Sequence, residues 1–172
     1  MELELKFAGG GLCREGALIE GYASRFGQPD QGGDVVMAGA FTASLSRLAA
    51  SGEKVRMLWQ HDPASPIGVW DEIAEDAVGL RVRGRLLPQI AKAREAAALI
   101  AEGAIDGLSI GYRTIRASQG AKGLRHLNEL DLWEISLVTF PMLKEARLGR
   151  KEAAEQIAIA AMLRDAAAAL RG

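Results

Sequence analysis

The chain has 172 residues, which is enough for one domain of ordinary size with a single hydrophobic core. Hydrophobic residues make up 49% and charged residues 25% of the chain, a composition typical of globular rather than disordered proteins. The formal net charge of -1 provides no strong field to attract nucleic acid or an anionic membrane, so neither is expected as a partner.

Cysteine and histidine are scarce. The single cysteine, Cys13, cannot form an internal disulfide, which favours a reducing compartment. His61 and His126 are the only histidines and form no cluster with cysteine, so we expect no metal site and no cofactor. The start MELELKF lacks the pattern of a signal peptide, and no stretch approaches the roughly 20 apolar residues that span a bilayer. We therefore expect a protein that is cytosolic where it is made.

The first quarter of the chain predicts two strands and a helix. Alternation of apolar and polar residues over 2–7 and 17–26 predicts strands, and the segment GQPDQGGD reads as a loop. After the segment GDVVMAGAF, a short helix is expected to end at Gly52, because its apolar residues recur at helical spacing: Phe41, Leu45 and Leu48.

The middle of the chain predicts three more strands. Residues 54–60 form an apolar strand that ends at His61, and residues 67–74 and 78–87 form two others. The last of these alternates between an apolar face (Leu80, Val82, Gly84) and an arginine face (Arg81, Arg83, Arg85). We interpret the arginines as a solvated face rather than as a nucleic-acid-binding stripe.

A helix is predicted over residues 89–102, capped by Gly103. Two long strands follow, in DGLSIGYRTIRA and LNELDLWEISLVTF, joined by a turn-like SQGAKG loop. About seven strands, two or three helices and no regular βαβ alternation favour a mainly β fold, an antiparallel barrel or sandwich with helices packed outside. We expect the domain to span residues 1–148 and an Ala-rich helical tail to span 149–172.

Ser109 lies in the sequence Gly-Leu-Ser-Ile-Gly, which matches the G-x-S-x-G nucleophile elbow of α/β-hydrolases. That fold does not fit, because IGYRTIRA alternates like a strand where the elbow requires a helix. The α/β-hydrolase order of serine, acid and histidine also fails, since the only histidine after Ser109 is His126. The pattern alone is weak evidence, because most serines on strands are structural.

His61 is the better partner for Ser109. It ends an apolar strand in the sequence LWQHD, and the end of a strand at the rim of a barrel is a rigid support for a general base. For an isolated histidine, a loop residue bonded to a backbone carbonyl is the commoner alternative.

Glu134 is the candidate for a third member of the site. It interrupts the apolar run LWEISLV, where a buried carboxylate is costly unless it is paired, and orienting an imidazole would pair it. Asp131 is the other candidate, but alternation places these two carboxylates on opposite faces of the strand. A salt bridge from Glu134 to an arginine such as Arg113 is the structural alternative.

Four motifs in order resemble the tailed-phage prohead (capsid maturation) protease family: GDVVMAGAF, LWQHD, GLSIGYR and ELDLWEISLVTFPM. The resemblance covers roughly residues 15–147. It implies a fold like that of herpesvirus assembly proteases, a barrel of about seven strands wrapped by helices. It also implies a serine endopeptidase with a Ser-His-acid or Ser-His-His site. Carried over by motif, Ser109 is the nucleophile, His61 the general base and Glu134, in preference to Asp131, the third member.

The resemblance also implies the partners and the place of action. The substrates would be the major capsid protein, its scaffold and the protease itself, inside the procapsid in the host cytoplasm, and a homodimer remains open. By analogy, backbone N–H groups near Met142 and Leu143 would stabilise the oxyanion. Gly111 and Gly68 would allow close approach of substrate, although turn or packing roles fit these two glycines equally well.

Two other interpretations remain at this point. A non-catalytic scaffold or capsid assembly protein with a protease fold would have the barrel without a working site, but both Ser109 and His61 are retained in their motifs. An unrelated small esterase is disfavoured by the order of His61 and Ser109 along the chain. The source, phage or gene transfer agent, is left open.

Overall fold

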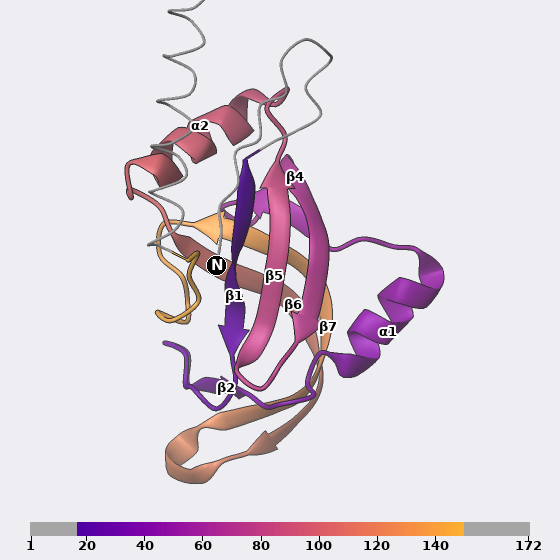
Figure 1. Ribbon diagram of the computed structural model, residues 1–172. Helices are drawn as coiled ribbons and strands as arrows, with labels where there is room; N and C mark the ends of the chain where they lie inside the picture. Colours follow the sequence, from indigo (N-terminus) through magenta and orange to yellow (C-terminus); the bar gives the residue numbers. More distant parts are fainter. Residues whose placement is uncertain (1–16, 150–172) are drawn as a thin grey trace, which may run out of the picture.

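The computed structural model describes residues 17–149. The strand expected at residues 2–7, Cys13 and the tail from residue 150 onward lie outside the described residues. The elements in chain order are β1 (Leu18–Arg25), β2 (Asp34–Val36), α1 (Thr42–Ser51), β3 (Arg56–Trp59), β4 (Asp62–Glu75), β5 (Gly79–Leu86), α2 (Ala91–Ala101), β6 (Gly107–Gln119), the 3-10 turn Ala121–Gly123 and β7 (Arg125–Val138) (Figure 1).

The seven strands form one curled sheet in the order β1-β5-β4-β3-β7-β2, with β6 paired to β7 along nearly its whole length. The predicted mainly β fold with about seven strands is confirmed. Two pairings are parallel, however, because β2 and β3 both run alongside β7 in its own direction. The sequence did not predict these parallel pairs, since they join segments that are far apart along the chain.

A short segment after β7 closes the curled sheet. Residues 146–149 lie between β1 and β6, through bridges of Leu148 to Gly21 and of Arg147 to Gly107. The N–H of Leu108 donates to the carbonyl of Ala146 at 2.8 Å. On the other side, the N–H of residue 149 donates to the carbonyl of Glu20 at 3.1 Å. This seam strand, residues 146–149, therefore joins the two strand edges that the rest of the sheet leaves open.

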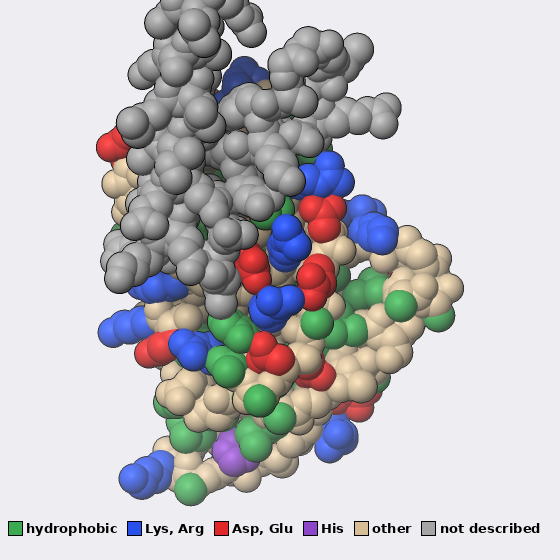
Figure 2. Space-filling view, viewed as in Figure 1, with side chains coloured by type: hydrophobic (Ala, Val, Ile, Leu, Met, Phe, Trp, Pro, Cys, Tyr) green, Lys and Arg blue, Asp and Glu red, His purple; other side chains and the backbone are tan. Residues whose placement is uncertain are grey.

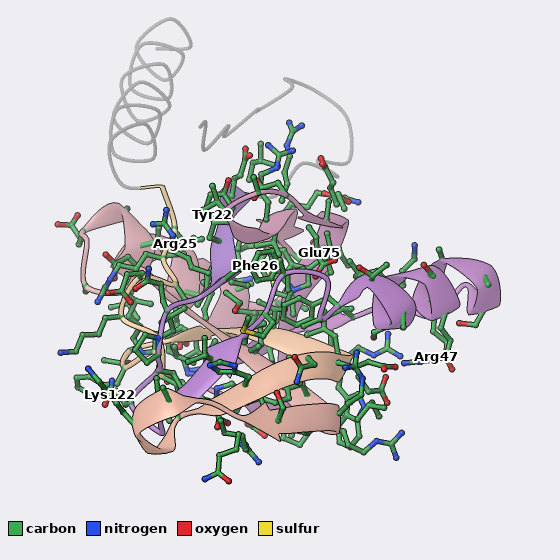
Figure 3. The ribbon with its side chains drawn as sticks, turned by 90° about the horizontal axis from the view of Figure 1, so that it is seen from below. Tyr22, Arg25, Phe26, Arg47, Glu75 and Lys122 are labelled. Atoms are coloured by element: carbon green, nitrogen blue, oxygen red, sulfur yellow. The ribbon has the colours of Figure 1, made fainter. Side chains whose placement is uncertain are left out.

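The helices lie outside the sheet, as predicted. Helix α2 buries Ala93, Ala96 and Ile100, and α1 ends at Gly52 in a left-handed conformation (φ 74°). The start of α1 is held by Glu75 of β4, whose carboxylate accepts from the N–H of Phe41 (2.9 Å) and the hydroxyl of Thr42 (2.6 Å) (Figure 3).

The predicted two-faced strand is β5. Leu80 and Val82 are buried in the core, whereas Arg81, Arg83 and Arg85 lie on the other face and are partly or fully exposed. Arg81 donates to Glu20 (3.0 Å) and Glu72 (2.8 Å). Figure 2 shows basic and acidic side chains interspersed on this face. The arrangement agrees with the solvated face interpreted from the sequence, and it adds the acidic partners of Arg81.

Candidate active site

The turn between β3 and β4 places His61 at the end of a strand. Gln60 and His61 have φ angles of 52° and 60°, a left-handed conformation that is uncommon outside glycine and needs support from its surroundings. That support comes from β7. The N–H of Gln60 donates to the carbonyl of Leu137 at 2.9 Å, and the N–H of His61 donates to Oγ of Ser136 at 3.1 Å.

The register of β6 and β7 places Ser109 on the same face as Glu134. Ser109 is opposite Ser136, and Gly111 is opposite Glu134. Residues opposite each other in an antiparallel pair, and residues two apart along a strand, share a face of the sheet. Ser109 is only 7% exposed, so its hydroxyl lies in the protein rather than in open solvent.

The carboxylate of Glu134 joins this face to His61. Its Oε1 lies 2.6 Å from Nδ1 of His61, and its Oε2 accepts a hydrogen bond from Oγ of Ser136 at 2.5 Å. The hydrogen bond from the His61 ring to the Glu134 carboxylate raises the pKa of His61 above its ordinary value; burial opposes this rise and the charge of Glu134 adds to it. With Nδ1 bonded to the carboxylate, Nε2 is the ring nitrogen left to accept a proton.

Asp131 lies away from His61. Its carboxylate pairs with Arg47 of α1, with Arg113 of β6 at 3.2 Å and with Nε1 of Trp133 at 3.1 Å. Arg47 is labelled in Figure 3. Because Arg113 pairs with Asp131, the structural alternative of a Glu134–Arg113 salt bridge is wrong.

A cavity of about 160 Å³ lies beside Ser109. It is bounded by β6, by the end of β1 and the following loop, and by the segment after β7. Its lining includes Ser109, Ile110, Arg25 (labelled in Figure 3), Asp30, Met142 and Leu143. Ser109 and the segment that the family resemblance associates with the oxyanion, Met142 and Leu143, thus line the same cavity.

The two glycines singled out in the sequence have packing roles. A β-carbon at Gly111 would lie 2.1 Å from Oε1 of Glu134, so this glycine makes room for the carboxylate. A β-carbon at Gly68 would meet Sδ of Met57 and the carbonyl oxygen of Arg85, both at 2.4 Å.

Ser136 was not among the residues predicted from the sequence. The available signal was a hydroxyl inside the apolar run EISLVTF, two residues after Glu134 and hence on the same face of the strand. Across residues 17–149, no group of three or more His, Cys, Asp or Glu side chains is arranged to hold a metal ion. In the same part of the chain, no helix is long and apolar enough to cross a membrane.

Comparison with known proteins identifies the family. The sequence matches the caudovirus prohead serine proteases over residues 4–159. The chain belongs to this family. It is 35% identical to the prohead protease of Enterobacteria phage HK97 over 159 residues, which cover 91% of this chain and 68% of that protein. Membership of this family confirms the prediction of a serine endopeptidase that acts in capsid maturation. It excludes the alternative of an unrelated esterase.

Solved structures are similar to this prohead protease as well. The capsid assembly protease of bacteriophage T4 superposes with a TM-score of 0.60 at 16% identity, over 73% of this chain and 82% of that one. The protease of KSHV, solved with a hexapeptide phosphonate inhibitor, gives a TM-score of 0.49 at 11% identity, over 86% of this chain and 77% of that one. The similarity to the T4 enzyme establishes the fold alone.

Proposed function

We propose that Ser109, His61 and Glu134 form the catalytic triad of this prohead protease. The observation that carries the proposal is the 2.6 Å contact between Nδ1 of His61 and Oε1 of Glu134, on the face of β6 and β7 that also holds Ser109. Glu134 fixes the imidazole so that Nδ1 carries a proton and Nε2 is free to act as the base.

The reaction is acyl transfer in two steps. Nε2 of His61 takes the proton of Ser109 as Oγ attacks the peptide carbonyl, and the carboxylate of Glu134 stabilises the imidazolium that forms. The imidazolium then gives this proton to the leaving amine, so the C–N bond breaks and an acyl-serine remains. Water, deprotonated by His61, releases the acid and restores Ser109.

The cavity beside Ser109 is proposed to hold a side chain of the substrate next to the scissile bond. Met142 and Leu143 line the same cavity, which supports backbone N–H groups of this segment as the oxyanion donors. No residue of this mechanism requires a cofactor.

The substrates are proposed from the relatives. One relative is named a prohead protease and a structural neighbour a capsid assembly protease, which supports capsid proteins as substrates. We propose that the enzyme cleaves the major capsid protein, the scaffold and itself, inside the procapsid in the host cytoplasm. A homodimer stays a prediction, which analytical ultracentrifugation of the full chain would test.

The test is co-expression with the neighbouring capsid protein, followed by mass spectrometry of the products. Wild type should yield defined fragments, and Ser109→Ala should yield none while it keeps the fold, since only one hydroxyl is lost. His61→Ala should be similarly inactive, because triad members act as a unit. His126→Ala is the matched control, since it removes the only other histidine and should process normally. Processing by Ser109→Ala at the wild-type rate would exclude this triad.

A further inference from the structure

Ser136 is a buried polar residue at the centre of the candidate site. The residue is 0% exposed. It lies in β7, and neither the match to the family nor the proposed triad gives it a role. A buried hydroxyl is costly unless hydrogen-bonded, so its partners indicate what it does.

Both hydrogen-bonding functions of this hydroxyl are directed at the triad. Oγ accepts from the backbone N–H of His61 at 3.1 Å and donates to Oε2 of Glu134 at 2.5 Å. Oε1 of the same carboxylate contacts Nδ1 of His61 at 2.6 Å. The three contacts form a closed ring through His61 backbone, Ser136, Glu134 and His61 side chain.

Each contact in this ring removes a degree of freedom. The bond to Oε2 limits rotation of the Glu134 carboxyl group, whose last torsion otherwise has only a broad preference. The bond from the His61 N–H supports a left-handed residue, whose backbone is strained without such a partner. A triad needs both restraints, because a misplacement of about 1 Å costs about 10²-fold in rate.

We propose that Ser136 is a positioning residue of this protease, whose hydroxyl fixes the Glu134 carboxylate and the His61 backbone so that the imidazole stays aligned for Ser109. This inference rests on the proposed triad. Ser136 touches neither the substrate nor the reacting atoms in this role; it acts through its two neighbours.

The test compares Ser136→Ala with Ser44→Ala. Ser44 is a matched control, because it is also 0% exposed and its Oγ also accepts a backbone N–H, that of Leu132 at 3.0 Å. Both variants should lose similar thermal stability. Only Ser136→Ala should lower kcat, by about 10- to 100-fold with KM within about twofold, since the loss is in alignment.

A second readout does not depend on turnover. Only two histidines are present, so NMR titration of their ring protons in the full chain carrying Ser109→Ala resolves His61, with His126 as an internal reference. Adding Ser136→Ala should bring the pKa of His61 back toward its ordinary value, whereas adding Ser44→Ala should not. An unchanged titration together with unchanged kcat would overturn the positioning role, even if the triad is correct.

If Ser136→Ala fails to fold, Ser136→Cys fills the site with a slightly larger side chain of the same shape and replaces the hydroxyl by a weaker donor and acceptor. This variant should fold, with the same downward shift of the His61 pKa and a lower kcat. Wild-type values of both quantities in folded Ser136→Cys would overturn the proposal. Failure of the triad itself would be distinguished by Ser109→Ala retaining capsid processing.

Discussion

The carboxylate of Glu134 lies over Gly111, in the space that a side chain at position 111 would occupy. The two residues are partners in the β6–β7 register. A β-carbon on Gly111 would come within 2.1 Å of Oε1 and 2.8 Å of the carboxyl carbon of Glu134. The neighbour is the end of a side chain rather than backbone, so the strand could accept an alanine only by moving the carboxylate.

Gly111→Ala should therefore damage the site more than the fold. The displaced carboxylate would lose its contact with His61, so kcat should fall by about 10²-fold or more, and the NMR pKa of His61 should fall toward its ordinary value. Thermal unfolding should remain cooperative. A Gly111→Ala enzyme with full activity would mean that the observed Glu134–His61 contact is not needed for catalysis.

Two carboxylates of β7, Glu134 and Asp131, should differ sharply in their effect on activity. Glu134→Gln keeps the shape but removes the charge that stabilises the imidazolium, so kcat should fall by about 10²- to 10⁴-fold. Asp131→Asn weakens contacts to partly exposed arginines, worth about 1 kcal/mol or less, and should leave kcat close to wild type. An inactive Asp131→Asn enzyme beside an active Glu134→Gln enzyme would reverse this assignment.

Local patterns predicted much of the fold, whereas the resemblance to prohead proteases was needed to select the candidate site residues. Alternation predicted β5 and its two faces, and a charge interrupting an apolar strand pointed to Glu134. The parallel pairing of β3 with β7 brings His61 to Glu134, and no local pattern encodes a contact between residues 73 positions apart. Ser136 was missed for a related reason, because a buried serine reveals its importance only through partners supplied by the tertiary structure.

The pH dependence of activity follows from the raised pKa of His61. The base must be neutral, so kcat/KM should fall as the pH drops through the raised pKa, and the acid limb should lie above pH 6.5, the ordinary value. Glu134→Gln removes the main cause of the rise, so the acid limb should move to lower pH while the plateau also falls. His126→Ala should leave the profile unchanged. An acid limb at the same pH in Glu134→Gln would contradict this origin of the shift.

The same shift has a consequence for stability. The folded state binds the His61 proton more tightly than the unfolded chain does, so this stabilisation is complete below about pH 6.5 and is lost as the pH rises through the folded-state pKa. Comparing urea unfolding of wild type and His61→Ala across this range should show the difference between them shrinking as the pH rises. A difference that grows with pH would mean that the folded-state pKa of His61 is lowered.

The seam strand sets a limit on how far the C-terminal end can be shortened. Residues 146–149 pair with β1 on one side and β6 on the other, and Ala146 and Leu148 are buried in the core. A chain truncated after Gly149 keeps all of these contacts, so it should stay soluble and unfold cooperatively in urea. A chain truncated after Glu145 loses them and leaves two strand edges unpaired, which favours aggregation.

The point substitution Leu148→Ala gives a graded version of the same test. It removes a buried side chain and should cost about 2–5 kcal/mol of unfolding free energy, while the seam hydrogen bonds remain. If the proposed self-cleavage falls near the C-terminal end, the product must end at or beyond residue 149 to keep the seam strand whole. Intact-mass spectrometry of the processed enzyme measures where it ends. An active, cooperatively folded product that ends before Ala146 would show that the seam strand is dispensable and that β1 and β6 need no partner at this edge.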